Sequence, residues 1–587
     1  MNAGGYAPPR NVLATKRPET VLATLTTGSM RPHAAGLSAT QIRALSLYVS
    51  DLPFGSSVLA EGTVGMCASR PQPIRLASTE WNGWGRDASN SRFQPNPGFR
   101  AVDLPRLKVK WAFGYLDGGQ VSQPTVVGNR VFVTNSRGLY SLDAASGCTY
   151  WIYKLDARGA RAAVVIGAQR AAGGLRHTAY VANRGSTEVH AVDAQTGTRL
   201  WRTKVGDHPV AQLTGSPALI GDRLYVPISS AEESSAGGPA YECCTFRGSI
   251  VALDVRTGAI VWRGYAIEAA PAPITRNSAG VQMHGPAGAA IWSSPTYDAK
   301  RNSLYAGTGN SYTEVEEAGS SAIVAFDAAT GKLKWQNQVT DADNYVVGCF
   351  GPSEGRPAPH ANCPKLLGPD WDFGSSTILS TLAGGQQVLV AGQKSGIAYG
   401  LNPDDGRKLW QVRLGAGGPL GGIQWGFAAD SEYVYVGVAD AGRYNFRKEP
   451  ARPGLSKLRI ATGEIVWHTP APARDCAWGI VARADSVTFP GGCSSDMSAP
   501  ITVIPGAVFA PSVDGKLRAF STLDGTLQWT FDTGREFKTV NGVAARGGSL
   551  NATGATIANG RLFLNSGYGG YGNQPGNVLL ALTIDGR

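Results

Sequence analysis

One stretch of sequence decides the fold: Ala325-Phe326-Asp327-Ala328-Ala329-Thr330-Gly331-Lys332-Leu333-Lys334-Trp335. Apolar residues lead into Asp327, a Thr-Gly turn follows, and a short strand ends on a tryptophan. An Asp carboxylate can accept hydrogen bonds from the backbone of a turn, and glycine adopts a positive φ at no steric cost. The stretch therefore predicts a tight β-hairpin with a large aromatic side chain on its second strand.

The same pattern recurs, so the hairpin is one copy of a repeat. Further copies end at Trp151, Trp201, Trp262, Trp410, Trp467 and Trp529. Successive tryptophans lie 50 residues (Trp151 to Trp201) to 75 residues (Trp335 to Trp410) apart, which leaves room for four short strands per unit. Units of this kind predict a β-propeller, and the high counts of glycine (76) and tryptophan (14) agree with many turns and large aromatics.

The two ends of the repeat region predict how the ring closes. The chain stops at Val578–Arg587, just past a turn and before any tryptophan strand, while an extra strand with Trp111 (107–113) precedes the first unit. We expect the extra strand to complete the last blade, because this leaves no open sheet edge. The prediction is an all-β, eight-bladed propeller over residues 79–587.

The segment before the propeller has a different character. Residues 37–49 show apolar residues at helical spacing behind Ser38, which suits an N-cap, and a second short helix is expected from Pro18 to Leu25. We therefore divide the chain into a helical segment (1–55), a linker rich in Gly, Ser and Pro (56–78) and the propeller.

Composition and charge exclude several classes of protein. With 43% hydrophobic and 17% charged residues the chain is globular rather than disordered. The net charge is +11, but no run of basic residues interleaved with aromatics predicts nucleic-acid binding; a basic surface would suit an acidic redox partner. No segment is as long as a transmembrane helix, so we expect no membrane span.

The eight cysteines point to an oxidising compartment. No pair has the CxxC spacing of zinc ribbons or covalent haem attachment, and the local pairs Cys349/Cys363 and Cys476/Cys493 predict disulfides. The adjacent Cys243 and Cys244 either bond to each other or pair elsewhere, for example with Cys67 and Cys148. Because residues 1–10 lack the apolar core of a signal peptide, we expect the chain to start inside a longer protein exported to the periplasm.

The repeated turn resembles the tryptophan-docking motif of the pyrroloquinoline-quinone (PQQ) dehydrogenases over about residues 80–587. The resemblance implies an eight-bladed propeller with PQQ and a metal ion at the mouth of a central funnel. Binding and assembly proteins also use such blades, so a non-catalytic scaffold is the alternative of another class. The residues that break the repeat have to discriminate between the two.

One such segment, Asp370-Trp371-Asp372-Phe373, resembles a family signature in which the last Asp is the catalytic base. A carboxylate can take the proton of an alcohol while a cation polarises the quinone. The plain alternative for Asp372 is a turn residue. Position 374 is Gly, where lanthanide-using relatives carry an extra Asp, so the resemblance favours calcium.

Two further segments resemble metal-ligand sites of the family. Gly307-Thr308-Gly309-Asn310 follows an expected strand and matches a ligating Asn, although Gly-Asn at a strand end is commonly a turn. Ser229-Ser230-Ala231-Glu232-Glu233 matches a ligating Glu, for which we select Glu232, with Glu233 as the alternative. Together Glu232, Asn310 and Asp372 offer only oxygen ligands, which suit a hard cation such as calcium.

The predicted contacts to PQQ come from five other residues. The resemblance implies that Trp292 stacks on the quinone, Thr214 donates a hydrogen bond to the cofactor, and Lys394 contacts the quinone oxygens and stabilises negative charge. It also implies a vicinal disulfide, Cys243–Cys244, against the PQQ face, although here the pair follows the Glu site, not one blade earlier as in methanol dehydrogenases. A core tryptophan and a surface lysine are the plain alternatives for Trp292 and Lys394.

Three features resemble those of the polyvinyl-alcohol dehydrogenase branch of the family. They are the segment that begins at Trp81, at the start of the predicted propeller, the segment Cys243-Cys244-Thr245-Phe246-Arg247-Gly248, and the Cys349…Cys363 loop. They imply oxidation of secondary or polymeric alcohols, with electrons passing to a cytochrome c; another alcohol or a sugar is the alternative substrate. Residues 1–50 resemble the rear half of the cytochrome c domain that such proteins commonly carry, with Met30 in the place of the axial Met. Since no CxxCH is present, haem c is expected only if an upstream segment is missing from this chain.

Overall fold

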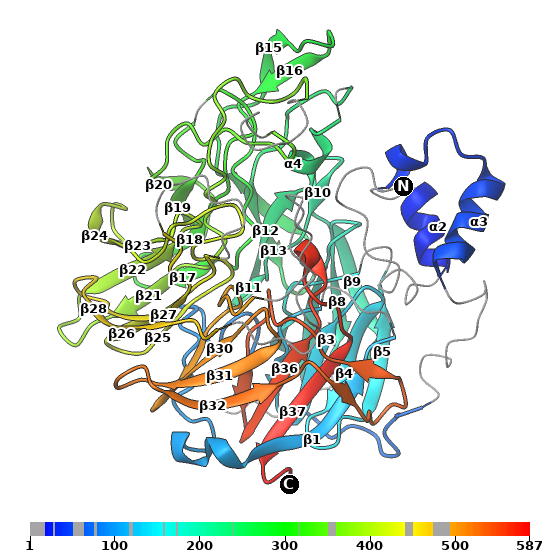
Figure 1. Ribbon diagram of the computed structural model, residues 1–587, viewed down its shortest axis with the longest axis vertical. Coiled ribbons are helices and arrows are strands. Elements are labelled where there is room, and N and C mark those ends of the chain that lie inside the picture. Colours follow the sequence, from blue (N-terminus) through cyan, green and yellow to red (C-terminus); the bar gives the residue numbers. More distant parts are fainter. Residues whose placement is uncertain are drawn as a thin grey trace.

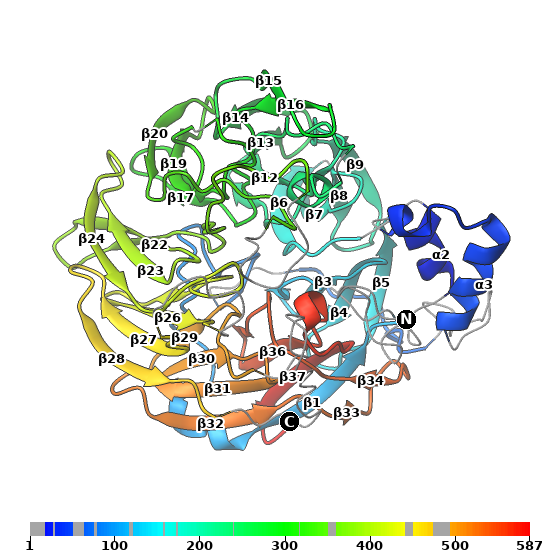
Figure 2. The same ribbon diagram turned by 45° about the horizontal axis from the view of Figure 1, so that its top comes forward.

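The protein forms a ring of β-sheets around a central axis (Figures 1 and 2). The computed structural model describes residues 18–587 except 27–29, 51–63, 75–78, 117–120, 156–158, 172–173, 239, 316, 350–359, 441–449 and 474–493. Within these residues, seven sheets of four strands and one of five are the blades. The predicted eight-bladed β-propeller is confirmed.

The first four blades cover the chain from β2 to β20. Blade 1 contains β2 (Thr125–Val127), β3 (Arg130–Thr134), β4 (Gly138–Asp143) and β5 (Thr149–Lys154). Blade 2 contains β6 (Val165–Ala171), β7 (Gly174–Asn183), β8 (Glu188–Asp193) and β9 (Arg199–Lys204). Blade 3 contains β10 (Ala211–Gln212), β11 (Ala218–Ile220), β12 (Arg223–Ser230), β13 (Ser249–Asp254) and β14 (Ile260–Tyr265). Blade 4 contains β17 (Thr296–Asp298), β18 (Ser303–Gly307), β19 (Ala322–Asp327) and β20 (Leu333–Gln338).

The remaining four blades complete the ring. Blade 5 contains β21 (Ile378–Thr381), β22 (Gln387–Gly392), β23 (Ile397–Leu401) and β24 (Lys408–Arg413). Blade 6 contains β25 (Ala428–Ala429), β26 (Tyr433–Val438), β27 (Gly454–Arg459) and β28 (Ile465–Pro470). Blade 7 contains β29 (Thr502–Ile504), β30 (Ala507–Pro511), β31 (Lys516–Ser521) and β32 (Leu527–Asp532). Blade 8 contains β35 (Thr556–Ala558), β36 (Arg561–Ser566), β37 (Val578–Ile584) and β1 (Leu107–Gly114).

The closure of the ring follows the prediction from the two chain ends. Strand β1 pairs antiparallel with β37, and Trp111 lies opposite Ala581 in this pairing. Blade 8 is therefore built from the last three strands of the propeller and the strand that precedes the first blade. The pairing covers the edge of β37 that the chain would otherwise leave open.

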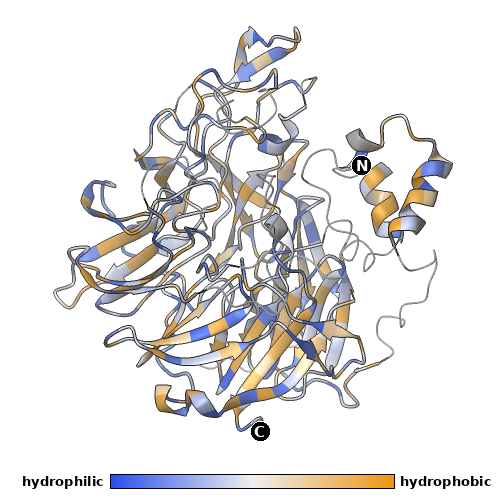
Figure 3. Cartoon of the chain, viewed as in Figure 1, coloured by the Kyte–Doolittle hydropathy of each residue, from blue (hydrophilic) through white to orange (hydrophobic). Residues whose placement is uncertain are grey.

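The cores of the blades lie on the middle strands. Every residue of β3 and β4 is buried, whereas the outermost strand β9 alternates between exposed and partly buried residues. Middle strands are covered on both faces by neighbouring blades, which explains why they are apolar without alternation. Figure 3 shows hydrophobic residues concentrated on the strands of the ring.

Among the described residues, the repeated turn joins a blade to the next one at seven of the eight junctions. Asp327 accepts hydrogen bonds from the backbone N–H of Ala329 (3.1 Å) and Thr330 (2.9 Å), and Gly331 has a φ of 74°. A Cβ at Gly331 would overlap the ring of Trp262, whose indole N–H donates to the carbonyl of Ala328 at 3.2 Å. The same packing of tryptophan on glycine recurs in the pairs Trp111/Gly147, Trp151/Gly197, Trp201/Gly258, Trp335/Gly406, Trp410/Gly463 and Trp467/Gly525. The turn is therefore a docking element between blades.

Elements outside the blades are few. Helices α2 (Pro18–Thr26) and α3 (Ala39–Val49) pack together beside the ring, with the 3-10 helix η1 (Arg31–Ala34) between them in sequence (Figures 1 and 2). Both predicted helices are present, and Ser38 caps α3 through the N–H of Gln41. The other elements are η2 (Ala101–Arg106), α4 (Glu232–Ser235), η4 (Gly570–Gly572) and two hairpins, β15 (Ala272–Arg276) with β16 (Gln282–Gly285) and β33 (Glu536–Phe537) with β34 (Ala545–Arg546). No helix among the described residues is long and apolar enough to cross a membrane.

Candidate active site

A cavity of about 400 Å³ lies where loops from several blades meet. Its wall includes loops that follow β10, β12, β18 and β22, so strand ends from blades 3, 4 and 5 supply many of its side chains, and further lining residues such as Arg184, Ala439 and Val513 follow strands of blades 2, 6 and 7. The charged side chains in the wall are Glu233, Asp370, Asp372, Asp496, Arg161, Arg184 and Lys394. Of the predicted site residues, Thr214, Trp292, Asn310, Asp372 and Lys394 line this one cavity.

Lys394 links two carboxylates of the loop before β21. Its Nζ donates to Oδ2 of Asp372 at 2.7 Å and to Oδ1 of Asp370 at 2.9 Å, and all three residues are buried. Burial lowers the pKa of Lys394, but the charges of Asp370 and Asp372 outweigh it, so the pKa lies well above its ordinary value. The amine therefore stays protonated and holds both carboxylates in the wall.

Asp372 and Asn310 are in direct contact. The backbone N–H of Asn310 donates to Oδ1 of Asp372 at 2.8 Å. The side-chain NH₂ of Asn310 donates to the carbonyls of Ser311 and Tyr345, each at 2.8 Å. Because both amide hydrogens are used, Oδ1 is the atom that Asn310 can offer to a ligand in the cavity.

The two adjacent glutamates lie in different surroundings. Glu232 is fully buried, and its carboxylate accepts hydrogen bonds from the N–H groups of Thr245 (2.9 Å) and Phe246 (2.8 Å) and from the Tyr241 hydroxyl (3.1 Å). It does not line the cavity, whereas Glu233 does. Of the two candidates, Glu233, the alternative to Glu232, is therefore the carboxylate available to a cation in the cavity, and successive residues on the short helix α4 differ in direction by about 100°.

The acidic wall is electrostatically strained. Burial and the charge of Asp372 raise the pKa of Glu233 to about 8, against a weaker opposing effect of Lys394. Burial and the charges of Asp372 and Glu233 raise the pKa of Asp370 well above its ordinary value, although Lys394 lowers it. Three carboxylates thus face one lysine, and a second cation at this wall would relieve their repulsion.

Asp343 binds the backbone of the loop that carries Asp370 and Asp372. Its carboxylate accepts hydrogen bonds from the backbone N–H groups of Asp370 and Trp371 and from the Ser321 hydroxyl, each at 2.8 Å. Burial raises its pKa to about 6 in spite of these bonds. The sequence did not single out Asp343, which fixes the segment that carries Asp372.

Trp292 forms an aromatic wall of the cavity. The Nζ of Lys394 lies 5.7 Å from its ring centroid, and Trp425 meets it edge-on at 5.3 Å between centroids. A Cβ at Gly374 would overlap the Trp292 ring, so the position two residues after Asp372 has no room for a side chain. Thr214, from the loop after β10, lies in the same cavity with its hydroxyl 2.6 Å from that of Ser229.

The adjacent cysteines do form a disulfide, but away from the cavity. Cys243 and Cys244 are bonded to each other and fully buried among side chains such as Ala287 and Val346. Neither is among the lining residues. The segment turns into the core beside β16, where His284 donates its backbone N–H to the carbonyl of Cys243, and contact of this pair with the cofactor stays a prediction.

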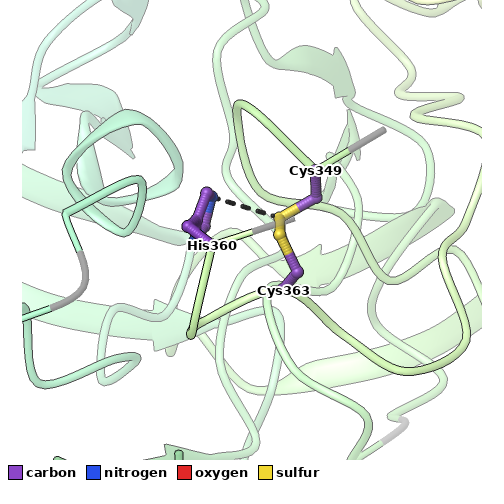
Figure 4. A group of neighbouring side chains, drawn as sticks. All are labelled: Cys349, His360 and Cys363. Atoms are coloured by element: carbon purple, nitrogen blue, oxygen red, sulfur yellow. Dashed lines mark hydrogen bonds between the residues drawn. A yellow bond between two sulfur atoms is a disulfide. The ribbon is translucent and has the colours of Figure 1, made fainter. Parts of the chain in front are cut away.

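The other bridges confirm part of the cysteine prediction. Cys349 is bonded to Cys363, and Cys67 to Cys148. Cys476 and Cys493 lie outside the described residues. Figure 4 shows His360 beside the Cys349–Cys363 bridge, with Nε2 3.2 Å from Sγ of Cys349. The three ligand atoms are close enough to hold a metal, but the two sulfurs are bonded to each other. The group is therefore a disulfide with a neighbouring histidine.

Sequence reasoning missed the cationic side of the cavity. The guanidinium of Arg161 lies 4.6 Å from the ring centroid of Trp425, and Nε of Arg184 donates to Oε1 of Gln212 at 3.0 Å. Both arginines line the cavity. Neither belongs to a motif, and only the ring fold brings them opposite Asp372 and Glu233, so no local signal marked them.

Comparison with known proteins decides the family. A family model described as the β-propeller domain of glucose/ethanol/alcohol dehydrogenase (PQQ) matches residues 81–345, and one described as the outer membrane protein assembly factor BamB matches residues 393–567. The chain is 42% identical to a polyvinylalcohol dehydrogenase of Pseudomonas sp., covering 100% of this chain and 92% of that protein. It is 40% identical to a polyvinylalcohol dehydrogenase of Sphingopyxis sp. (strain 113P3), covering 100% and 91%. The chain belongs to the PQQ-dependent alcohol dehydrogenase family.

Solved structures agree with this PQQ-dependent alcohol dehydrogenase at the level of the fold. The quinohemoprotein alcohol dehydrogenase of Comamonas testosteroni has a TM-score of 0.60 at 18% identity and covers 87% of this chain and 81% of its own. The ADHIIG enzyme of Pseudomonas putida HK5 has a TM-score of 0.62 at 18% identity, with the same coverage. The full-length similarity to two dehydrogenases also decides between an enzyme and a non-catalytic scaffold, in favour of the enzyme.

The cavity of this PQQ-dependent alcohol dehydrogenase fits the cofactor of its family. Trp292 offers an aromatic face, and Arg161, Arg184 and Lys394 offer positive charge to an anionic quinone. The carboxylates of Glu233 and Asp372 and the amide oxygen of Asn310 are the hard oxygen donors that calcium takes. The residues present thus suit both PQQ and a hard cation.

Proposed function

We propose that this PQQ-dependent alcohol dehydrogenase uses calcium, oxidises secondary or polymeric alcohols and passes the electrons to a cytochrome c in the periplasm. The observation that carries the proposal is the convergence of Glu233, Asn310, Asp372 and Lys394 on one cavity beside Trp292. Three oxygen donors and one positioned ammonium group in such a cavity suit alcohol oxidation better than simple binding.

The residues of the chain then have distinct roles. When bound, PQQ supplies the electrophilic quinone that accepts a hydride, and calcium supplies the charge that polarises it. Asp372 removes the hydroxyl proton of the alcohol, and Lys394, 2.7 Å from it, stabilises the negative charge that develops nearby. Trp292 would offer the quinone an aromatic face, and oxygen atoms of Glu233, Asn310 and Asp372 would hold the cation.

Calcium, and not a trivalent lanthanide, is supported by the donor set. A lanthanide site of the resembled family has an additional carboxylate at the position of Gly374. Here a Cβ at that position would overlap Trp292. With one carboxylate fewer, the site matches the lower charge of calcium.

The substrate class, the electron acceptor and the location are argued from the relatives, the net charge and the disulfides. Two relatives that match over the whole chain are named polyvinylalcohol dehydrogenases, which favours secondary hydroxyl groups along a polymer. The net charge of +11 suits an acidic electron acceptor such as a cytochrome c, and the described disulfides suit an oxidising compartment. Haem c is proposed only for a longer form of the chain, since this sequence contains no CxxCH.

The test is reconstitution of the cofactor-free protein with PQQ and calcium. Dye reduction is measured with secondary alcohols, polyvinyl alcohol, primary alcohols and sugars, and then with an acidic cytochrome c in place of the dye. We expect turnover with secondary alcohols and the polymer, and reduction of the cytochrome. Absence of turnover with every alcohol, or turnover with lanthanum but not with calcium, would contradict the proposal.

A further inference from the structure

Helix α4, which carries Glu233, is too short to be stable without contacts from the rest of the protein. Helix α4 has four residues, Glu232–Ser235, and its N-cap residue Ala231 makes no side-chain capping bond. A helix of one turn is unstable on its own. The direction of the Glu233 side chain therefore depends on the contacts that hold α4 from outside.

A segment closed by the Cys349–Cys363 bridge supplies such contacts near both of its ends. Before the bridge, the backbone N–H of Val347 donates to the carbonyl of Glu233 at 3.0 Å. Next to Cys363, the side chain of Asn362 reaches the chain that follows α4. The bridge ties these two points together.

Asn362 makes a dense set of hydrogen bonds. Its Nδ2 lies 3.0 Å from the carbonyls of Ala236, Gly238 and Tyr241, so its two hydrogens are shared among three acceptors. Its Oδ1 accepts from Nδ2 of Asn277 at 2.7 Å, which fixes the orientation of the amide. The residue is 2% exposed and does not line the cavity.

Two of the carbonyls that Asn362 binds belong to residues that also hydrogen-bond Glu232, the neighbour of Glu233 in α4. Ala236 directly follows α4, and its N–H donates to the carbonyl of Glu232 at 2.8 Å. The side chain of Tyr241 donates to the carboxylate of Glu232 at 3.1 Å. The end of α4 and its inward-facing glutamate are thus fixed by one network, in which Asn362 is the central donor.

We propose that Asn362, held by the Cys349–Cys363 bridge, is a positioning residue that aims Glu233 into the cavity for cation binding. The inference rests on the proposed calcium site. Asn362 touches no residue that reacts; it acts through the backbone of residues 236–241. Residues that orient metal ligands contribute to metal affinity although they do not touch the metal.

The experiment compares Asn362→Ala and Asn362→Asp with Asn541→Ala. Asn541 is a matched control because it also bonds backbone, with Gly114 N–H at 3.0 Å and Gly114 O at 2.7 Å, and it does not line the cavity. Calcium dissociation constants are measured by calorimetry on protein supplied with PQQ. Turnover at saturating calcium and the thermal midpoint without calcium are measured on the same samples.

We expect calcium to bind about 10-fold to 100-fold more weakly in Asn362→Ala, while turnover at saturating calcium returns close to that of the unchanged protein. A double variant, Cys349→Ser with Cys363→Ser, should shift calcium affinity in the same direction. Asn362→Asp, which places a carboxylate against three carbonyls, should have the larger effect; if it does not fold, Asn362→Ala decides alone.

Calcium affinity of Asn362→Ala equal to that of Asn541→Ala would overturn the inference, as would a loss of turnover that calcium does not restore. If the unchanged protein binds no calcium, the proposed function itself fails. That result is distinguishable because it appears before any variant is made.

Discussion

The docking turns and the cavity use the same kind of side chain in opposite ways. In the turns, burial is outweighed by hydrogen bonds from Thr330 and the backbone, so the pKa of Asp327 lies below its ordinary value; hydrogen bonds likewise lower the pKa of Asp143 and Asp254. In the cavity, burial and neighbouring charges raise the pKa of Glu233 to about 8 and that of Asp370 well above its ordinary value. A turn carboxylate with hydrogen bonds from its own turn stabilises the fold, whereas buried carboxylates that repel one another favour binding of a cation.

The difference explains why the repeat and the site never coincide. A turn aspartate has its acceptors filled by residues two and three positions away, so it works wherever the motif occurs. The cavity carboxylates face one another because the ring brings distant strand ends together. Their mutual repulsion costs stability, and a bound cation would remove that cost.

The largest expected effect is the loss of turnover in the variant Asp372→Asn. We expect turnover to fall by about 100-fold to 10,000-fold, because the alcohol loses its proton acceptor while the cofactor contacts of Trp292 and the arginines remain. Steady-state kinetics with a secondary alcohol measure this, and PQQ absorbance checks that the cofactor is retained. Turnover within a few-fold of the unchanged protein would contradict the assignment of the base.

The next largest expected effect is weaker calcium binding in the variant Glu233→Gln. We expect the dissociation constant to rise by about 100-fold or more, since a charged ligand is lost and not merely its support. Calorimetry on protein with PQQ measures it. Asp327→Asn is the control from the docking turns and should leave calcium affinity unchanged; equal losses in the two variants would refute the division of roles.

The pH dependence of the calcium effect follows from the raised pKa of Glu233. Between its ordinary pKa of 4.5 and about 8, the folded calcium-free protein keeps a proton that the unfolded chain has lost. Stability of the calcium-free protein therefore falls as pH rises through this window, and stabilisation by calcium grows. Thermal midpoints with and without calcium at about pH 5.5 and about pH 8 test this; an equal calcium shift at both pH values would speak against it.

The smallest expected effect is that of Asp327→Ala. Loss of the turn hydrogen bonds should lower the free energy of unfolding by about 1 kcal/mol, without a change in calcium affinity or turnover. Denaturant titration measures the stability, and calorimetry measures the binding. A strong loss of calcium binding would show that the docking turns and the cavity are coupled.

The fold was predictable because its signals are local. Each copy of the turn motif, from its aspartate to its tryptophan, is one short continuous stretch of sequence, and only the spacing of these copies is needed to count the blades. The closure by β1 followed from the rule that an unpaired edge strand seeks a partner, which the pairing of Trp111 with Ala581 bears out.

The site was predictable only in part. Asn310, Asp372 and Lys394 belong to short motifs at strand ends, and they do meet in the cavity. The choice between Glu232 and Glu233 was left open by the sequence because a short helix turns each successive side chain by about 100°, which no strand pattern fixes. The position of the Cys243–Cys244 bridge and the position of Arg161 depend on how whole loops pack. The residues next to them in the sequence do not determine this packing.

The account is tested most directly by a crystal structure of the protein with calcium and PQQ. It predicts one calcium ion in the cavity with oxygen atoms of Glu233, Asn310 and Asp372 at about 2.3–2.6 Å. A calcium ion bound by Glu232 instead, or one outside the cavity lined by Trp292 and Lys394, would contradict it.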